Sequence, residues 1–182
     1  MQARRLNRLT GYDYNQSGAY FITMCVEGRA QILSHVVVGT GVLDCPKAEL
    51  THYGQIAEKY LHQLNDFYST VSVDQYVIMP DHIHLILSVT NGQSRRPVPT
   101  KSNEKPSAKN SAVSQFVSTF KRFCNKEYGK NIWQRSFYDH VIRNEQDYQE
   151  VHDYITQNPM RWAQKHQTNF KENIHGKNMP TI

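Results

Sequence analysis

Hydrophobic and polar residues follow two different periods along this chain, and the alternation of these periods predicts strands and helices. Short segments rich in aromatic and β-branched residues predict strands at residues 19–26, 71–79, 82–89 and 132–142. Longer segments in which apolar residues recur at helical spacing predict helices at residues 50–67, 111–128 and 145–164.

The predicted order is strand, helix, strand, strand, helix, strand, helix. Without its last helix, this order is the split β-α-β pattern of a ferredoxin-like α+β domain, in which helices cover an antiparallel sheet. The tight turn Pro80-Asp81 joins the middle two strands as a hairpin. Pro159 lies inside the last helical pattern and predicts a kink or a break there. We therefore expect a ferredoxin-like sheet followed by one further helix.

The whole chain, residues 1–182, is expected to form a single domain. Residues 91–110 contain three prolines and no aromatic residue, which predicts a flexible insertion. Residues 169–182 are expected to form a polar tail. No apolar run is long enough to span a membrane, so we expect a soluble, cytoplasmic protein. Cys25, Cys45 and Cys124 are odd in number and lack CxxC spacing, which argues against a disulfide framework or a cysteine zinc site.

The net charge and the aromatic content of the chain suggest a class of partner. Its formal net charge is +5, and it contains eleven tyrosines. Lysine and arginine neutralise phosphates, while aromatic rings stack on unpaired bases, so the composition suits single-stranded nucleic acid. A solvated charged surface with half-buried tyrosines accounts for the same composition equally well.

Two histidines carry the first candidate chemistry. His82 and His84 flank Ile83 in a predicted strand, so the strand period of two directs both imidazoles to one face. They are either ligands of a shared metal ion or a pair of partly exposed histidines. The surrounding strand is otherwise hydrophobic and gives no packing reason for two imidazoles on one side, which favours the metal site. The preceding Asp81 is explained by its turn position and receives no metal role.

The last predicted helix carries the second candidate. Tyr154 and Asn158 are four residues apart, so both side chains lie on one helix face. Tyrosine can attack phosphorus, but a phenol with a pKa of about 10 is mostly neutral at neutral pH and needs assistance, which a metal on the target phosphate can supply. Taken alone, Tyr154 would be interpreted as a core or rim aromatic, and Asn158 as a helix terminator before Pro159.

Several sequence blocks resemble those of one enzyme family. The blocks VDQYVIMPDHIHLIL, WQRSFYDHVIRNEQDY and DYITQNPMRW resemble, in order, three blocks of the single-tyrosine HUH transposases of short insertion sequences and of their relatives, the REP-associated tyrosine transposases. The opening RRLNRLTGYDYNQSGAYFITMCVEGRAQIL is similar to the start of the REP-associated group. The resemblance covers most of the chain apart from the insertion and the tail.

This resemblance implies a role for each candidate residue. It implies a ferredoxin-like fold in which His82 and His84 are metal ligands, Tyr154 is the nucleophile, and Asn158 is the third ligand where some relatives have glutamine. Many relatives have asparagine or glutamate at the position of Asp81. Magnesium or manganese is the favoured metal because the reaction is phosphoryl transfer. Tyr148 is the rival nucleophile, but an offset of six residues puts it on a different helix face. His140 and His152 are interpreted as surface histidines.

The function implied is that of a metal-dependent DNA transposase, an endonuclease and strand transferase that cleaves and rejoins single-stranded or hairpin DNA through a 5′-phosphotyrosine intermediate. Relatives occur as dimers and as monomers, so a homodimer stays open. Two other classes also stay open. One is a domesticated hairpin-binding module without catalysis, and the other is a metal-dependent phosphodiesterase that uses water, on DNA or RNA.

Overall fold

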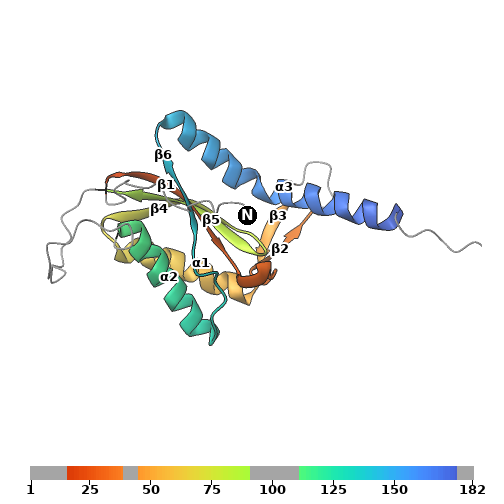
Figure 1. Ribbon diagram of the computed structural model, residues 1–182, viewed down its shortest axis with the longest axis horizontal. Helices are drawn as coiled ribbons and strands as arrows, with labels where there is room; N and C mark the ends of the chain where they lie inside the picture. Colours follow the sequence, from red (N-terminus) through yellow and green to blue (C-terminus); the bar gives the residue numbers. More distant parts are fainter. Residues whose placement is uncertain (1–15, 39–44, 91–110, 176–182) are drawn as a thin grey trace, which may run out of the picture.

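The computed structural model describes residues 16–38, 45–90 and 111–175, with side chains up to residue 166 (Figure 1). The expected insertion at 91–110 lies outside the described residues. The elements, in chain order, are β1 (Gly18–Cys25), the short 3-10 helix η1 (Glu27–Arg29), β2 (Ser34–Val37), β3 (Lys47–Leu50), α1 (His52–Phe67), β4 (Val71–Ile78), β5 (His82–Val89), α2 (Ala112–Tyr128), β6 (Tyr138–Ile142) and α3 (Glu145–His175).

Four strands form one antiparallel sheet in the order β4-β5-β1-β6, and β2 and β3 form a separate hairpin. The four-stranded sheet together with α1 and α2 is the ferredoxin-like arrangement, so the α+β prediction is confirmed. Figure 1 shows α1 and α2 on one face of the sheet and α3 on the opposite face. Strand β5, which carries the histidine pair, is therefore a central strand, and helices cover both faces of the sheet to which it belongs.

The main core lies between the sheet and the α1–α2 layer. Alternate residues of β1 enter this core, and Tyr20, Ile22 and Met24 are fully buried there. They meet the apolar stripe of α2, in which Phe116 and Phe120 are also fully buried. The remaining residues of β1 face α3. The strand period therefore separates a structural face of the sheet from the face on which the candidate chemistry lies.

The helix boundaries follow from local capping chemistry. Thr51 precedes α1, and its side-chain oxygen accepts a hydrogen bond from the backbone N–H of Gly54. Ser111 does the same for Ser114 at the start of α2. Gly129 ends α2 in the left-handed conformation with φ 68°, which glycine adopts without steric cost. These caps explain why both helices begin one or two residues later than their apolar patterns predict.

Three features differ from the sequence prediction. The last strand begins at Tyr138 and not at residue 132, because Trp133 instead forms an isolated bridge with Val26. The β2–β3 hairpin was not predicted. Helix α3 continues through Pro159 to His175, beyond the expected end at 164 and into the expected tail. Proline lacks the N–H that would bind the carbonyl four residues earlier, and Figure 1 shows α3 changing direction along its length.

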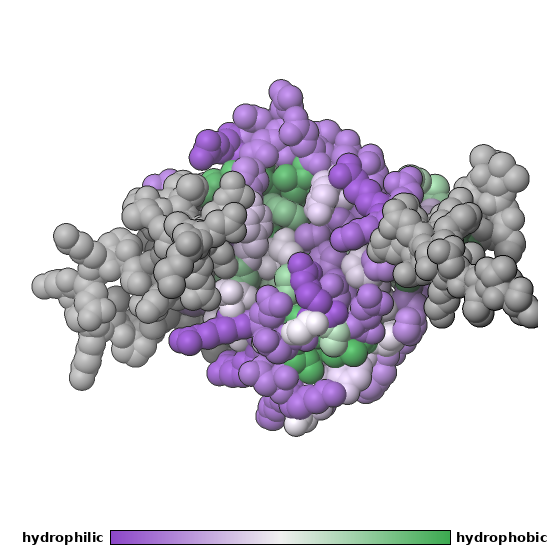
Figure 2. All heavy atoms as spheres, turned by 45° about the vertical axis from the view of Figure 1, so that its right-hand side comes forward, coloured by the Kyte–Doolittle hydropathy of each residue, from purple (hydrophilic) through white to green (hydrophobic). Residues whose placement is uncertain are grey.

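Hydrophilic residues cover most of the face seen in Figure 2, with smaller apolar areas between them. None of the helices in the described ranges has both the length and the apolar character needed to cross a membrane. Among the described residues, the exposed large hydrophobic side chains are Val37, Val38, Phe67, Tyr138 and Met160.

Candidate functional site

The two histidines of β5 lie on the α3 face of the sheet and are both buried, with 8% of His82 and 6% of His84 exposed. Ile83 and Leu85 alternate with them and enter the main core. The Nε2 atoms of the two rings are 3.0 Å apart. The sequence prediction that both imidazoles share one face is confirmed, and the two rings converge on one point.

Each histidine is held through its other ring nitrogen. The Nδ1 atom of His82 is hydrogen-bonded to the carboxylate of Asp81, and Nδ1 of His84 lies 2.8 Å from the hydroxyl oxygen of Thr23. When these oxygens accept a hydrogen bond from Nδ1–H, both Nε2 atoms carry free lone pairs. A histidine that binds metal is oriented by such a partner in most known sites. Thr23 and Asp81 therefore leave both rings prepared to accept a cation.

Burial and neighbouring charges shift the pKa values of Asp81 and His84. Burial alone would raise the pKa of Asp81, but its hydrogen bond with His82 and the charges of His82 and Arg29 outweigh that effect and lower it. The guanidinium of Arg29 is 3.5 Å from the Asp81 carboxylate. Burial and, to a lesser degree, the neighbouring His82 lower the pKa of His84 to about 3. His84 therefore stays neutral, the form in which imidazole can bind a metal.

Helix α3 brings a third group over the histidines. The ring of Tyr154 packs edge-on against His84, with ring centroids 5.2 Å apart, and Trp162 packs against His82 at 6.1 Å. Asn158 lies between these two residues on the same helix face, one turn from each, and only 6% of it is exposed. Among the described residues, no group of three His, Cys, Asp or Glu could hold a metal ion. The buried amide of Asn158 is therefore the candidate for a third protein ligand beside the histidines.

The donor set suits a divalent cation of moderate size. Two neighbouring ligands about 2.1 Å from an octahedral metal are roughly 3 Å apart, which agrees with the 3.0 Å between the Nε2 atoms. An amide oxygen is a hard ligand that Mg²⁺ and Mn²⁺ accept, and imidazole also suits softer metals. His82, His84 and Asn158 are thus the residues that would hold the metal expected from the sequence, if one binds there.

Comparison with known proteins finds several that are similar to this chain. No family model matches it. An uncharacterized protein of Haemophilus influenzae is 29% identical over 170 residues, which cover 88% of this chain and 91% of that protein. A REP-associated tyrosine transposase of Escherichia coli is 29% identical over 89 residues, 49% of this chain and 44% of the enzyme. This chain is therefore similar to the REP-associated tyrosine transposases. The resemblance inferred from its sequence blocks is thus confirmed.

A solved structure supports the fold of this chain. The structure of a REP-associated tyrosine transposase bound to a REP hairpin superposes with a TM-score of 0.59 and 23% sequence identity, over 85% of this chain and 73% of that one. The shared features are the antiparallel sheet, the helices packed on it and the helix that follows. This likeness concerns the fold alone.

The other sequence candidates lie apart from the histidine pair. Tyr148 packs in a small apolar cluster around Ile86, Ile142 and Ile155, and burial together with the nearby Asp74 raises its pKa. His140 is hydrogen-bonded to Asp147. His152 lies 3.7 Å from Asp153. In the described structure, Tyr154 is thus the tyrosine of α3 whose ring contacts a site histidine.

Sequence reasoning missed several residues around the site. Thr23 is on β1 and reaches His84 only because Thr23 and His84 are partners in the β1–β5 register. Arg161 places its guanidinium over the ring of Tyr154, 5.2 Å from the centroid. Its spacing of seven residues from Tyr154 is the one local signal that could have indicated this contact. Thr23, Arg29 and Trp162 carry no such signal, because their contacts cross between elements.

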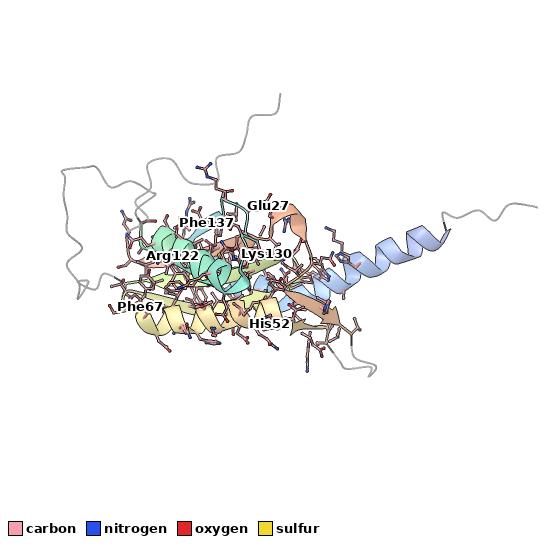
Figure 3. All side chains as sticks on the ribbon, turned by 90° about the horizontal axis from the view of Figure 1, so that it is seen from below. Glu27, His52, Phe67, Arg122, Lys130 and Phe137 are labelled. Carbon is pink, nitrogen blue, oxygen red and sulfur yellow. The ribbon has the colours of Figure 1, made fainter. Side chains whose placement is uncertain are left out.

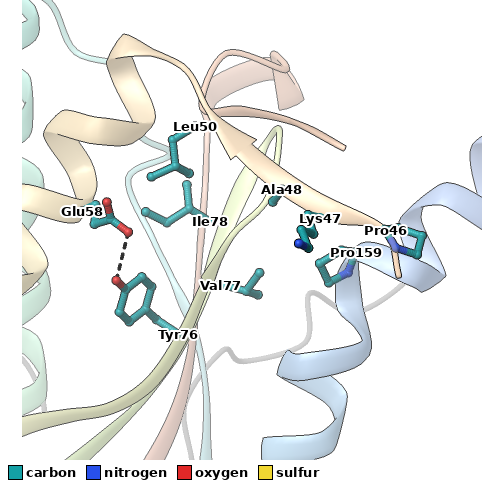
Figure 4. A pocket seen from close by; sticks show the side chains of 9 residues that line it. All are labelled: Pro46, Lys47, Ala48, Leu50, Glu58, Tyr76, Val77, Ile78 and Pro159. Atoms are coloured by element: carbon teal, nitrogen blue, oxygen red, sulfur yellow. Dashed lines mark hydrogen bonds between the residues drawn. The ribbon is translucent and has the colours of Figure 1, made fainter. Parts of the chain in front are cut away.

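A cleft of about 390 Å³ opens beside this site, between β3 and the outer edge of β4 (Figure 4). The hydroxyl of Tyr76 donates a hydrogen bond to Glu58 at 3.0 Å, and burial together with this bond raises the pKa of Tyr76 to about 12. Val77, the register partner of His84, and Pro159, the neighbour of Asn158, both line the cleft. The cleft is therefore adjacent to the histidines, from which β4 and α3 separate it.

Proposed function

We propose that this chain is a metal-dependent transposase that cleaves and rejoins single-stranded DNA, with Tyr154 as its nucleophile. The observation that carries the proposal is the packing of Tyr154 on His84, whose Nε2 atom converges with that of His82. A nucleophile beside a metal-binding pair is the arrangement that phosphoryl transfer by a tyrosine requires. The similarity to REP-associated tyrosine transposases supports the same function, and the structure of one such transposase contains a bound REP hairpin.

His82, His84 and Asn158 would hold Mg²⁺ or Mn²⁺. When bound, the cation withdraws negative charge from the scissile phosphate and so makes it more easily attacked. Asp81 and Thr23 keep the imidazoles oriented. The guanidinium of Arg161 lies over the Tyr154 ring, 5.2 Å from its centroid, and helps to hold the ring in place beside His84.

In the proposed cleavage step, the phenolic oxygen of Tyr154 attacks phosphorus and forms a phosphotyrosine ester. The bond between phosphorus and the 3′ oxygen breaks, the 3′ oxygen gains a proton, and the phenolic proton passes to solvent. The 5′ end of the downstream strand remains attached to the protein. Because this ester retains the energy of the phosphodiester, a second 3′-hydroxyl can attack it, reform a DNA strand and release Tyr154 without ATP.

The test uses labelled single-stranded DNA from the flanks of the gene, incubated with Mg²⁺ or Mn²⁺ and separated by denaturing electrophoresis. We expect a protein–DNA adduct that maps to a peptide containing Tyr154. The Tyr154→Phe variant should lose cleavage and the adduct but keep DNA binding, since it loses only a hydroxyl. Tyr148→Phe is the matched control on the same helix and should cleave normally.

Other outcomes would identify a different function. Cleavage that persists in Tyr154→Phe without an adduct on any tyrosine would indicate a phosphodiesterase that activates water. Binding of hairpin DNA without cleavage by the wild-type protein would indicate a domesticated recognition module. An adduct on Tyr148 would preserve the transposase mechanism and overturn the assignment of the nucleophile.

A further inference from the structure

An exposed aromatic ring lies on the same sheet face as the histidines, outside the site described above. Tyr138 is the first residue of β6, and 52% of it is exposed. Its strand neighbours Asp139 and Val141 are buried, whereas Tyr138 projects into solvent. Single exposed aromatics are common on protein surfaces, so exposure alone would mean nothing. The position of Tyr138 in the sheet gives it significance.

Tyr138 belongs to a row of side chains that crosses the sheet to His84. Tyr138 is the register partner of Thr23, and Thr23 is in turn the register partner of His84. Direct partners in an antiparallel sheet project to the same face. The hydroxyl of Thr23 bonds to His84, which fixes that face as the one covered by α3. Tyr138 therefore lies two strand spacings from His84, or roughly 10 Å along the row.

The end of this sheet face at Tyr138 is exposed in the described structure. Helix α3 covers the opposite end of β6, where Ile155 packs with Ile142, whereas 52% of Tyr138 is exposed. Tyr138 also lies on the edge strand β6, which has no strand neighbour beyond it among the described residues. A DNA strand whose phosphate reaches His84 and Tyr154 has the exposed surface at Tyr138 available for a neighbouring nucleotide. A distance of two strand spacings corresponds to the length of about one or two nucleotides.

The surroundings of Tyr138 suit a nucleic acid better than an apolar protein partner. Arg135, three residues before Tyr138, and Arg143, just after the far end of β6, are both exposed. Cations near an exposed aromatic ring suit a strand whose bases stack while its phosphates are neutralised. The chain leading to Tyr138 is also fixed, because the ammonium of Lys121 donates hydrogen bonds to the carbonyls of Gln134 and Ser136, at 2.8 and 3.0 Å. The ring is thus presented on an anchored strand.

We infer that Tyr138 is a positioning residue whose ring stacks on an unpaired base one or two nucleotides from the phosphate attacked by Tyr154. This inference rests on the proposed function. The stacked base anchors the strand, so the ring sets both the affinity for substrate and the position of the cut. The chemistry recognised is the flat face of a nucleobase, which depends little on sequence.

The experiment measures binding and cleavage of the same labelled single-stranded DNA, with 2-aminopurine placed at successive positions on both sides of the cut. Tyr138→Thr removes the ring and keeps a residue that favours strands. We expect a 5- to 100-fold loss of affinity, about the contribution of one stacked base, together with a raised KM and little change in kcat. The fluorescence of 2-aminopurine at one or two positions should be quenched by the wild-type protein and recover in the variant.

Two sets of variants separate stacking from structure. Tyr138→Phe and Tyr138→Trp keep an aromatic face and should retain affinity and quenching. Phe67→Ala removes another exposed aromatic, at the end of α1 and apart from Phe137, the residue before Tyr138 (Figure 3), and should change neither. The inference would be overturned, and the proposed function left intact, if Tyr138→Thr bound DNA and quenched 2-aminopurine as the wild type does. The same conclusion would follow if Tyr138→Phe and Tyr138→Trp bound DNA no more tightly than Tyr138→Thr. Absence of single-strand binding and cleavage by the wild type would overturn both.

Discussion

The hydroxyl oxygen of Thr23 lies 2.8 Å from Nδ1 of His84, and the two residues are partners on neighbouring strands. Because the sheet register brings them together, the ring of His84 is oriented by a residue of the neighbouring strand β1 and not by a residue close to it in the sequence. Its partner His82 is held differently, by the adjacent Asp81. The two metal-binding candidates therefore depend on different parts of the structure.

Thr23→Val should reduce metal affinity about 10- to 100-fold, the usual cost of losing the group that orients a metal-binding histidine. Valine has nearly the shape of threonine but cannot hydrogen-bond to Nδ1. Titration calorimetry with Mn²⁺ measures the change, and Thr23→Ser serves as the control that keeps the hydroxyl. Unchanged Mn²⁺ affinity in Thr23→Val would show that Thr23 does not prepare His84 for metal.

His82→Ala and His84→Ala should each abolish most cleavage while leaving much of the DNA binding. The reason is that each change removes one of two converging nitrogens. A gel assay with and without excess chelator gives the rate, and circular dichroism checks the fold. Full cleavage by either variant, or by wild type in chelator, would contradict the metal assignment.

Lys121 should give the protein a stability that rises with alkaline pH. Burial lowers its pKa from 10.5 to about 8 in the folded chain. Between these values the unfolded chain binds more protons than the folded one, so the free energy of unfolding increases with pH across that window. Relative to Lys121→Met, the wild type should gain about 1–2 kcal/mol between pH 7 and pH 10.

Urea unfolding at several pH values measures the contribution of Lys121. The neutral amine still has hydrogens to donate to Gln134 and Ser136, so its bonds survive deprotonation. A difference between wild type and Lys121→Met that stays constant from pH 7 to pH 10 would show that the ammonium is not destabilised by burial.

Binding should favour single-stranded or hairpin DNA over a plain duplex and weaken as salt rises. The net charge of +5 neutralises phosphates, and released counterions supply part of the affinity. Fluorescence anisotropy across a salt series, with a perfect duplex of matched length as the comparison, measures both effects. Equal affinity for the duplex would indicate a different partner.

The parts of the site that could be predicted from the sequence are those set by local periodicity. His82 and His84 share a face because they are two apart on a strand, and Tyr154 and Asn158 share one because they are four apart on a helix. The order of the main strands and helices followed from the same periods. These properties require no knowledge of which elements pack together.

The rest of the site depends on tertiary structure. Nothing near Thr23 in the sequence indicates His84, and nothing near Trp162 indicates His82, since register and helix docking decide both contacts. The short β2–β3 hairpin has only four residues in each strand, too few for a clear alternation. The last strand was placed too early because Trp133 is apolar and buried like a strand residue but belongs to an isolated bridge.

The helix that carries Tyr154 comes after every strand of the sheet in the chain. During synthesis, the histidine pair and its supporting strands can therefore assemble before the nucleophile has left the ribosome. On the proposed mechanism, such a nascent chain could hold a metal and contact DNA but could not cut it. On this mechanism, cleavage therefore requires that the last helix has been synthesised and has docked on the sheet.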